Sequence, residues 1–154
     1  MKLITLVALL ISSNLFAADY ERHSDSFTIS TFAGNGARVY YNCDSVENKT
    51  KAVLEDMGAI VHSVRCTGGL DRWNGRFNLP ASVRVVYDTL NSEIDGNVVT
   101  MVGQSSIRER DNCHLNTSIF EAVKKNFEIY KYTSRRCFRP GDRTRINMTL
   151  LLAQ

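Results

Sequence analysis

Four cysteines at regular spacing constrain this chain more than any other feature of its sequence. Cys43 and Cys66 are 23 positions apart, and Cys113 and Cys137 are 24 positions apart. In each pair, the first cysteine begins a segment with helical periodicity and the second ends the strand expected after it. The two cysteines of such a strand–helix–strand unit can approach each other. Of the three possible pairings we therefore predict Cys43–Cys66 and Cys113–Cys137, each stabilising the fold by roughly 3 kcal/mol.

The N-terminal residues MKLITLVALLISSNLFA have the pattern of a secretory signal peptide. Lys2 precedes an apolar core over residues 3–11, and Ala17 and Ala18 are small residues suited to cleavage. No apolar run reaches the roughly 20 residues that a membrane-spanning helix needs. We expect residues 1–17 to be removed and residues 18–154 to form one disulfide-stabilised domain, periplasmic or secreted, with no membrane span.

The first half of the chain reads as strands around one helix. Residues 27–32 and 37–43 are expected to form a hairpin across a glycine-rich turn. A helix then begins at Asp44, with Glu47 as its capping-box partner, and ends at Gly58. A strand that ends at the second cysteine follows the helix.

The second half repeats the order of strand, helix and strand, with a helix that begins at Asp111 or Asn112. Its expected strands cover residues 82–88, 97–107, 128–137 and 143–152. We predict an α+β fold of the ferredoxin-like kind. In it, two strand–helix–strand halves form one antiparallel sheet with both helices on one face and extra strands at its edges.

The segment RRCFRPGDRTR, residues 135–145, holds five arginines around one cysteine. In a strand over 143–152, Arg143 and Arg145 lie opposite the apolar side chains. One interpretation is an anion-binding cluster that grips phosphate, sulfate or carboxylate groups by forked hydrogen bonds. The other is a solvated hairpin tip that protects a sheet edge. The candidate binding residues of this segment are Arg136, Arg139, Arg143 and Arg145.

A second candidate is the loop over residues 67–80, which contains the single tryptophan. Arg72, Trp73, Arg76 and Phe77 are residue types that dominate protein interfaces, and loops of this length are often functional. The alternative is that Trp73 and Phe77 fold back over the core as a lid.

Support for catalysis is thin, and no residue is identified as catalytic. His114 follows Cys113 directly, but a disulfide explains this cysteine better than a Cys–His nucleophile does. The three histidines lie far apart, no C-x-x-C occurs, and no nucleotide or hydrolase fingerprint is present. We therefore expect no cofactor and no metal.

The charge balance argues against a nucleic-acid partner. Without residues 1–17, which contain one lysine and no acid, 18 basic residues face 16 acidic ones, a net charge of +2. The sequence favours an exported binding or structural module that contacts an envelope protein, an anionic glycan or a lipid head group through its loops. The alternative is a small envelope hydrolase whose pocket leaves no linear motif. Nothing in the sequence indicates an oligomeric state.

Overall fold

The structure is a computed structural model that describes residues 20–31, 38–70, 79–90, 100–109, 112–138 and 141–153. Its strands are β1 (Tyr20–Thr28), β2 (Ile60–Gly69), β3 (Leu79–Leu90), β4 (Thr100–Glu109), β5 (Ile129–Ser134) and β6 (Thr144–Ala153). Its helices are α1 (Cys43–Asp56), α2 (Cys113–Val123) and the short 3₁₀ helix η1 (Lys124–Asn126).

The two halves of the chain have the same topology. The first half forms an antiparallel sheet in the order β1-β3-β2, and the second forms one in the order β4-β6-β5. In both halves the helix follows the first strand, and the last strand pairs between the other two. The structure therefore consists of two βαββ units. The predicted repeat of strand, helix and strand is present, but the strand over residues 82–88, expected in the second half, belongs to the first unit as β3.

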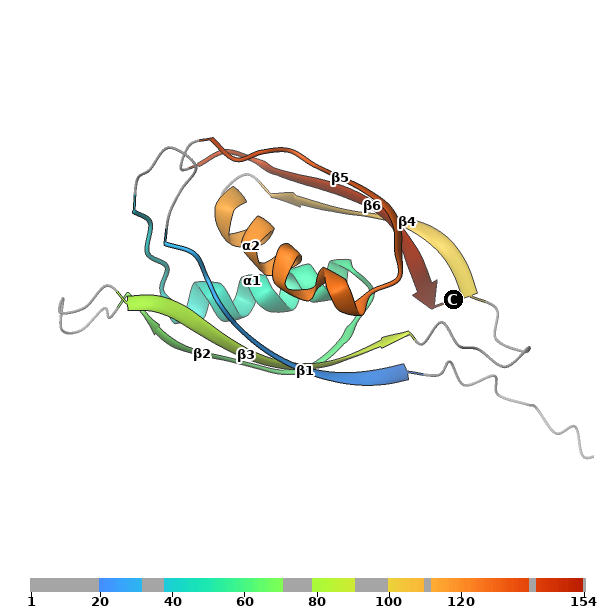
Figure 1. The fold of residues 1–154 in the computed structure, drawn as a ribbon, viewed down its shortest axis with the longest axis horizontal. Coiled ribbons are helices and arrows are strands. Elements are labelled where there is room, and N and C mark those ends of the chain that lie inside the picture. Colours follow the sequence, from blue (N-terminus) through green and yellow to red (C-terminus); the bar gives the residue numbers. More distant parts are fainter. Residues whose placement is uncertain are drawn as a thin grey trace, which may run out of the picture.

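The two helices lie between the two sheets (Figure 1). Helix α1 contacts β2, β3 and β4 as well as α2, and α2 contacts β6. The predicted α+β fold of two helices with antiparallel strands is confirmed. The ferredoxin-like arrangement, one sheet with both helices on one face, is not confirmed. Each unit completes its own sheet because its last strand inserts between its first two.

The last strand of each unit takes the central position because its inward side is the most apolar. Val83, Val85 and Tyr87 of β3 are at most 1% exposed, and the equivalent residues of β6 are also buried. The buried residues of β6 are Ile146, Met148 and Leu150. One continuous cluster of buried side chains runs from the first sheet through both helices to the second. Burial of this apolar surface is the main stabilising contribution to the fold.

Helix α1 begins at Cys43, one residue earlier than predicted. The side chain of Asn42, not Asp44, caps the helix by accepting a hydrogen bond from the backbone N–H of Ser45 at 2.7 Å. Glu47 does not complete a capping box, because it accepts from the backbone N–H of Cys66 at 2.7 Å. Gly58, at φ +84°, ends the helix as predicted.

The hairpin expected over residues 27–43 is wrong for the described residues. Strand β1 begins at Tyr20, seven residues before the strand expected over residues 27–32, and pairs with β3. What remains of the expected pairing is one hydrogen bond from the N–H of Val39 to the carbonyl of Thr31 at 2.8 Å. The polar residues of β1 are compatible with a strand because its outer face is solvent-exposed.

Both predicted disulfides are present. Cys43 is bonded to Cys66 and Cys113 to Cys137, and the described residues contain no free cysteine. Each bond joins the first residue of a helix to the end of, or the segment just after, the strand that follows it. The two disulfides therefore occupy equivalent places in the two βαββ units.

A polar cluster joins the first sheet to the segment that follows α2. The hydroxyl of Tyr87 donates to Asp25 Oδ2 at 2.7 Å, and Asn126 Nδ2 donates to the same oxygen at 2.6 Å. Lys125 Nζ lies 3.0 Å from Asp25 Oδ1. Burial acts to raise the pKa of Asp25, but the hydrogen bonds from Tyr87 and Lys125 and the nearby positive charge outweigh it and lower the pKa.

We expect Tyr87→Phe to destabilise the protein by about 1–3 kcal/mol, because it leaves the carboxylate and amide of this cluster with an unmade hydrogen bond. Tyr132→Phe is the matched control, since its hydroxyl contacts only Lys124 at the surface. It should change stability by less than about 0.5 kcal/mol. The measurement is urea unfolding at neutral pH. Equal losses for the two variants would contradict a structural role for the cluster.

Candidate anion-binding face

The outer face of the β4-β6-β5 sheet carries polar and basic side chains from all three strands. Ile146 and Met148 of β6 are buried against the helices, so the alternating Arg145 and Asn147 point away from them. Cross-strand partners share one face, and the register defines the set. We name it the basic face: Gln104, Ser106, Arg108, Lys131, Thr133, Arg135, Arg145, Asn147 and Thr149.

Three arginines form one row across this sheet. Arg108 of β4 is the register partner of Arg145 in β6. On the other side, the backbone N–H of Arg135 donates to the carbonyl of Arg145 at 3.0 Å, which places Arg135 opposite it. Neighbouring strands are about 4.8 Å apart. The row therefore places the guanidinium groups of Arg108 and Arg145 side by side, each able to form forked hydrogen bonds with an oxyanion, whereas Arg135 also lines the hollow beside α2.

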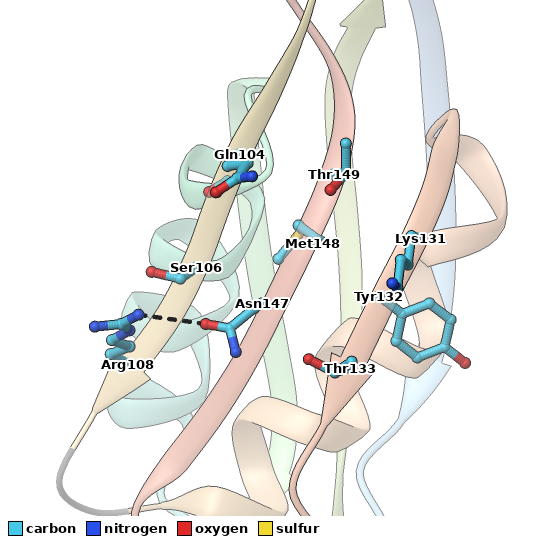
Figure 2. Close-up of a pocket in the computed structure, with 10 residues that line it drawn as sticks. Gln104, Ser106, Arg108, Lys131, Tyr132, Thr133, Asn147, Met148 and Thr149 are labelled. Carbon is cyan, nitrogen blue, oxygen red and sulfur yellow. Dashed lines mark hydrogen bonds between the residues drawn. The ribbon is translucent and has the colours of Figure 1, made fainter.

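Neutral hydrogen-bonding groups occupy the rows beside the arginines (Figure 2). They surround a surface hollow of about 530 Å³ that also reaches Lys131. Arg108 Nη2 donates to Asn147 Oδ1 at a long 3.4 Å, the one hydrogen bond drawn in Figure 2. Arg143 lies at the arginine end, where it shares a smaller hollow of about 190 Å³ with Arg108 and Arg145.

The acid nearest this face in sequence lies on the other side of the sheet. Glu109 lies two residues after the buried Ile107, so its side chain leaves β4 on the same side. There its carboxylate pairs with Lys49 of α1 at 2.6 Å. Asn116 of α2 also donates to Glu109, at 3.0 Å. The ion pairs of the described residues include none to a cation of the basic face. Glu109 also lines the small hollow at the arginine end, but its carboxylate is paired with Lys49.

The outer face of the β1-β3-β2 sheet differs in this respect. Asp88 accepts hydrogen bonds from Arg22 Nε at 2.9 Å and pairs with His62 Nε2 at 2.7 Å. The hydrogen bond from Arg22, then that with His62, holds the pKa of Asp88 well below its usual range. Arg65 and Arg84 are exposed register partners on this face. Its cations are thus partly balanced by one carboxylate.

A third hollow, of about 580 Å³, lies between α2 and the segment after β5. It is lined by His114, Arg136 and Phe138 beside the disulfide at Cys137. Phe138 is 62% exposed. Cys113 is in the disulfide, so it does not form a nucleophile with His114.

The structure brings together only some of the residues predicted to bind a ligand. Arg143 and Arg145 lie at one end of the basic face, whereas Arg136 borders the hollow beside α2. Five predicted residues lie outside the described ranges: Arg72, Trp73, Arg76, Phe77 and Arg139. Arg145 itself does not protect a sheet edge, because β6 is the central strand, but Arg135 and Arg136 follow the edge strand β5, so the solvated-hairpin interpretation of the segment stays open.

Sequence reasoning missed Arg108 and the neutral residues beside it. Every second residue of this strand is polar: Gln104, Ser106 and Arg108, with Ile107 between the last two. This pattern indicates one polar strand face. The sequence does not reveal that β4 pairs with β6, so it could not place Arg108 next to Arg145. The pairing partner, and not the residue type, was the missing information.

Within the described ranges, no group of three or more His, Cys, Asp and Glu side chains is arranged to hold a metal ion. The helices in these ranges include none long and apolar enough to cross a membrane.

Comparison of the chain with protein-family models gives no match, and neither curated proteins nor solved structures give a significant match.

We expect Asp88→Asn to strengthen anion binding by the first sheet, because it leaves Arg22 without its carboxylate partner on the face that also carries Arg84 and Arg65. Glu55→Gln is the matched control, since it makes the same change in net charge on α1. On a sulfated matrix at pH 7, Asp88→Asn should elute at higher salt than Glu55→Gln. Elution of both variants at the same salt would show that only net charge matters.

Proposed function

We propose that this chain is an exported, disulfide-stabilised binding module that holds an anionic partner on its basic face. The observation that carries the proposal is the pair of Arg108 and Arg145, joined at one end by Arg143, on a sheet face whose register partners include no described acid. Arginine forks suit phosphate, sulfate and carboxylate groups alike. The neutral groups beside the row add hydrogen bonds that an isolated charged patch would lack.

The geometry of the basic face fits a binding site better than it fits a hydrolytic active site. A catalytic site joins a concave pocket to titratable groups of shifted pKa. The largest shifts belong to Tyr87, whose pKa is raised chiefly by burial, and to Asp88, whose pKa is lowered by Arg22. Neither residue lines a hollow described above. Both are engaged in hydrogen bonds elsewhere in the fold.

The matched pair of arginines on the other sheet provides the control for the anion site. Arg108→Ser with Arg145→Ser should weaken retention on a sulfated matrix, since two lost contacts of about 1 kcal/mol each correspond to about 30-fold in affinity. Arg65→Ser with Arg84→Ser makes the same change in charge and should elute close to the unmodified protein. If the two double variants elute together, the basic face is not the binding site.

Export is tested by intact mass and non-reducing peptide mapping of the protein recovered from its own host. We expect cleavage near Ala17 and peptides joined through Cys43–Cys66 and Cys113–Cys137, because an oxidising compartment maintains structural disulfides. Recovery of a chain that retains residues 1–17 and carries reduced cysteines would contradict export.

A further inference from the structure

We infer that the ligand of the basic face is an acidic oligosaccharide. Its charged substituents would bind the arginine row, and its hydroxyl groups would bind the neutral rows. The inference rests on the proposed function and adds the chemical class of the ligand to it. It is carried by the composition of the rows beside the arginines.

Those rows offer donors and acceptors in equal measure. Asn147 and Gln104 carry amides, which both donate and accept, and the hydroxyls of Ser106, Thr133 and Thr149 do the same. Sugar hydroxyls also donate and accept, so each such contact can use both capacities. Phosphodiester oxygens only accept, and a polyphosphate would leave the acceptors of this face unused. The neutral rows are therefore better matched to a sugar than to a phosphate chain.

The dimensions of the face fit a short chain and not a single ion. From the row of Arg108 to the row of Gln104 is four residues along β4, or about 13 Å. A single anion would be held by donors that converge on one point, whereas these donors are spread over three rows and three strands. A linear ligand lying along the strands would contact all the rows at once.

Nucleic acid is a poorer match, because no aromatic side chain belongs to the basic face. Single-stranded nucleic acid is bound largely by stacking on aromatic rings. Tyr132 of β5 borders the hollow, but its ring packs edge-on against Phe120 at 5.3 Å and its hydroxyl bonds Lys124. Although Tyr132 is 42% exposed, Lys124 Nζ lies over its ring, 4.9 Å from the centroid, so one side of the ring is already engaged.

A membrane surface is also a poorer match. The exposed apolar residue of β4 is Val102, which is 58% exposed and six residues from Arg108, or about 20 Å along the strand. The interfacial layer of a bilayer is only about 5–8 Å thick on each side. Val102 and the arginine row could therefore not enter the hydrocarbon and the head groups together along this strand.

The test is calorimetric titration of the full exported chain with four probes. They are a sulfated tetrasaccharide, its unsulfated counterpart, inorganic polyphosphate of the same charge, and phosphatidylglycerol vesicles. The sulfated sugar should bind at least about fivefold more tightly than polyphosphate, the difference that one additional hydrogen bond of about 1 kcal/mol makes. The unsulfated sugar should bind far more weakly, because it lacks charge for the arginine row.

Two variants separate the ligand class from simple charge attraction. Asn147→Leu should weaken the sulfated sugar about fivefold and leave polyphosphate within about twofold. Gln104→Leu is the second variant, since Gln104 is exposed and tolerates replacement without loss of packing. Ser24→Ala, at an exposed position on β1, is the control and should change neither affinity. Thermal unfolding of each variant confirms that the fold is intact.

The outcomes distinguish this inference from the proposal on which it rests. If polyphosphate binds as tightly as the sugar and both leucine variants are silent, the ligand class is wrong and anion binding stands. If vesicles bind and the oligosaccharide does not, the ligand is a lipid and the inference is overturned. If no probe binds, the proposed function itself fails.

Discussion

The alternation of side chains along the two central strands is the constraint on which the rest of the structure depends. Every second residue of β3 and β6 is buried against the helical layer, including Tyr87 and Ile146. A shift of one residue in either strand would turn its whole apolar set to solvent. The same constraint places Arg145 and Asn147 outside, so core packing determines the geometry of the basic face.

The polar contacts between the two halves engage two carboxylates on the inner sides of the sheets. Glu109 is turned inward, where Lys49 and Asn116 satisfy it, and Asp25 is held by Tyr87 and Lys125. Each carboxylate is neutralised where it is partly desolvated, as buried charges require. The outer face of the second sheet consequently keeps its cations without a described acid among them. Stability and surface charge are linked through these interior pairs.

Much of the fold was accessible from the sequence because local rules determined it. Cysteine spacing predicted both disulfides, and Gly58 predicted where α1 ends. The alternation of residues 143–152 predicted which side of β6 faces the core. The division into two sheets was not accessible, because it depends on which strands pair over long distances. For the same reason Arg108 was missed: its partner Arg145 lies far along the chain.

The repeated topology explains why the two sheets offer different surfaces on similar frames. Both central strands carry an exposed arginine whose register partner on a neighbouring strand is also arginine: Arg84 with Arg65, and Arg145 with Arg108. In the first sheet, Asp88 lies on the same strand face as Arg84 and engages the neighbouring cation Arg22. Four residues after Arg145, the corresponding position of the second sheet is Thr149, flanked by Gln104 and Lys131, with no acid among the three. One carboxylate is worth little to stability at an exposed position. Its effect on the surface potential is larger, because it reverses the sign of one point in a small array of charges. A common βαββ frame can therefore present one balanced surface and one basic surface, and only the second has the unopposed charge that anion binding needs.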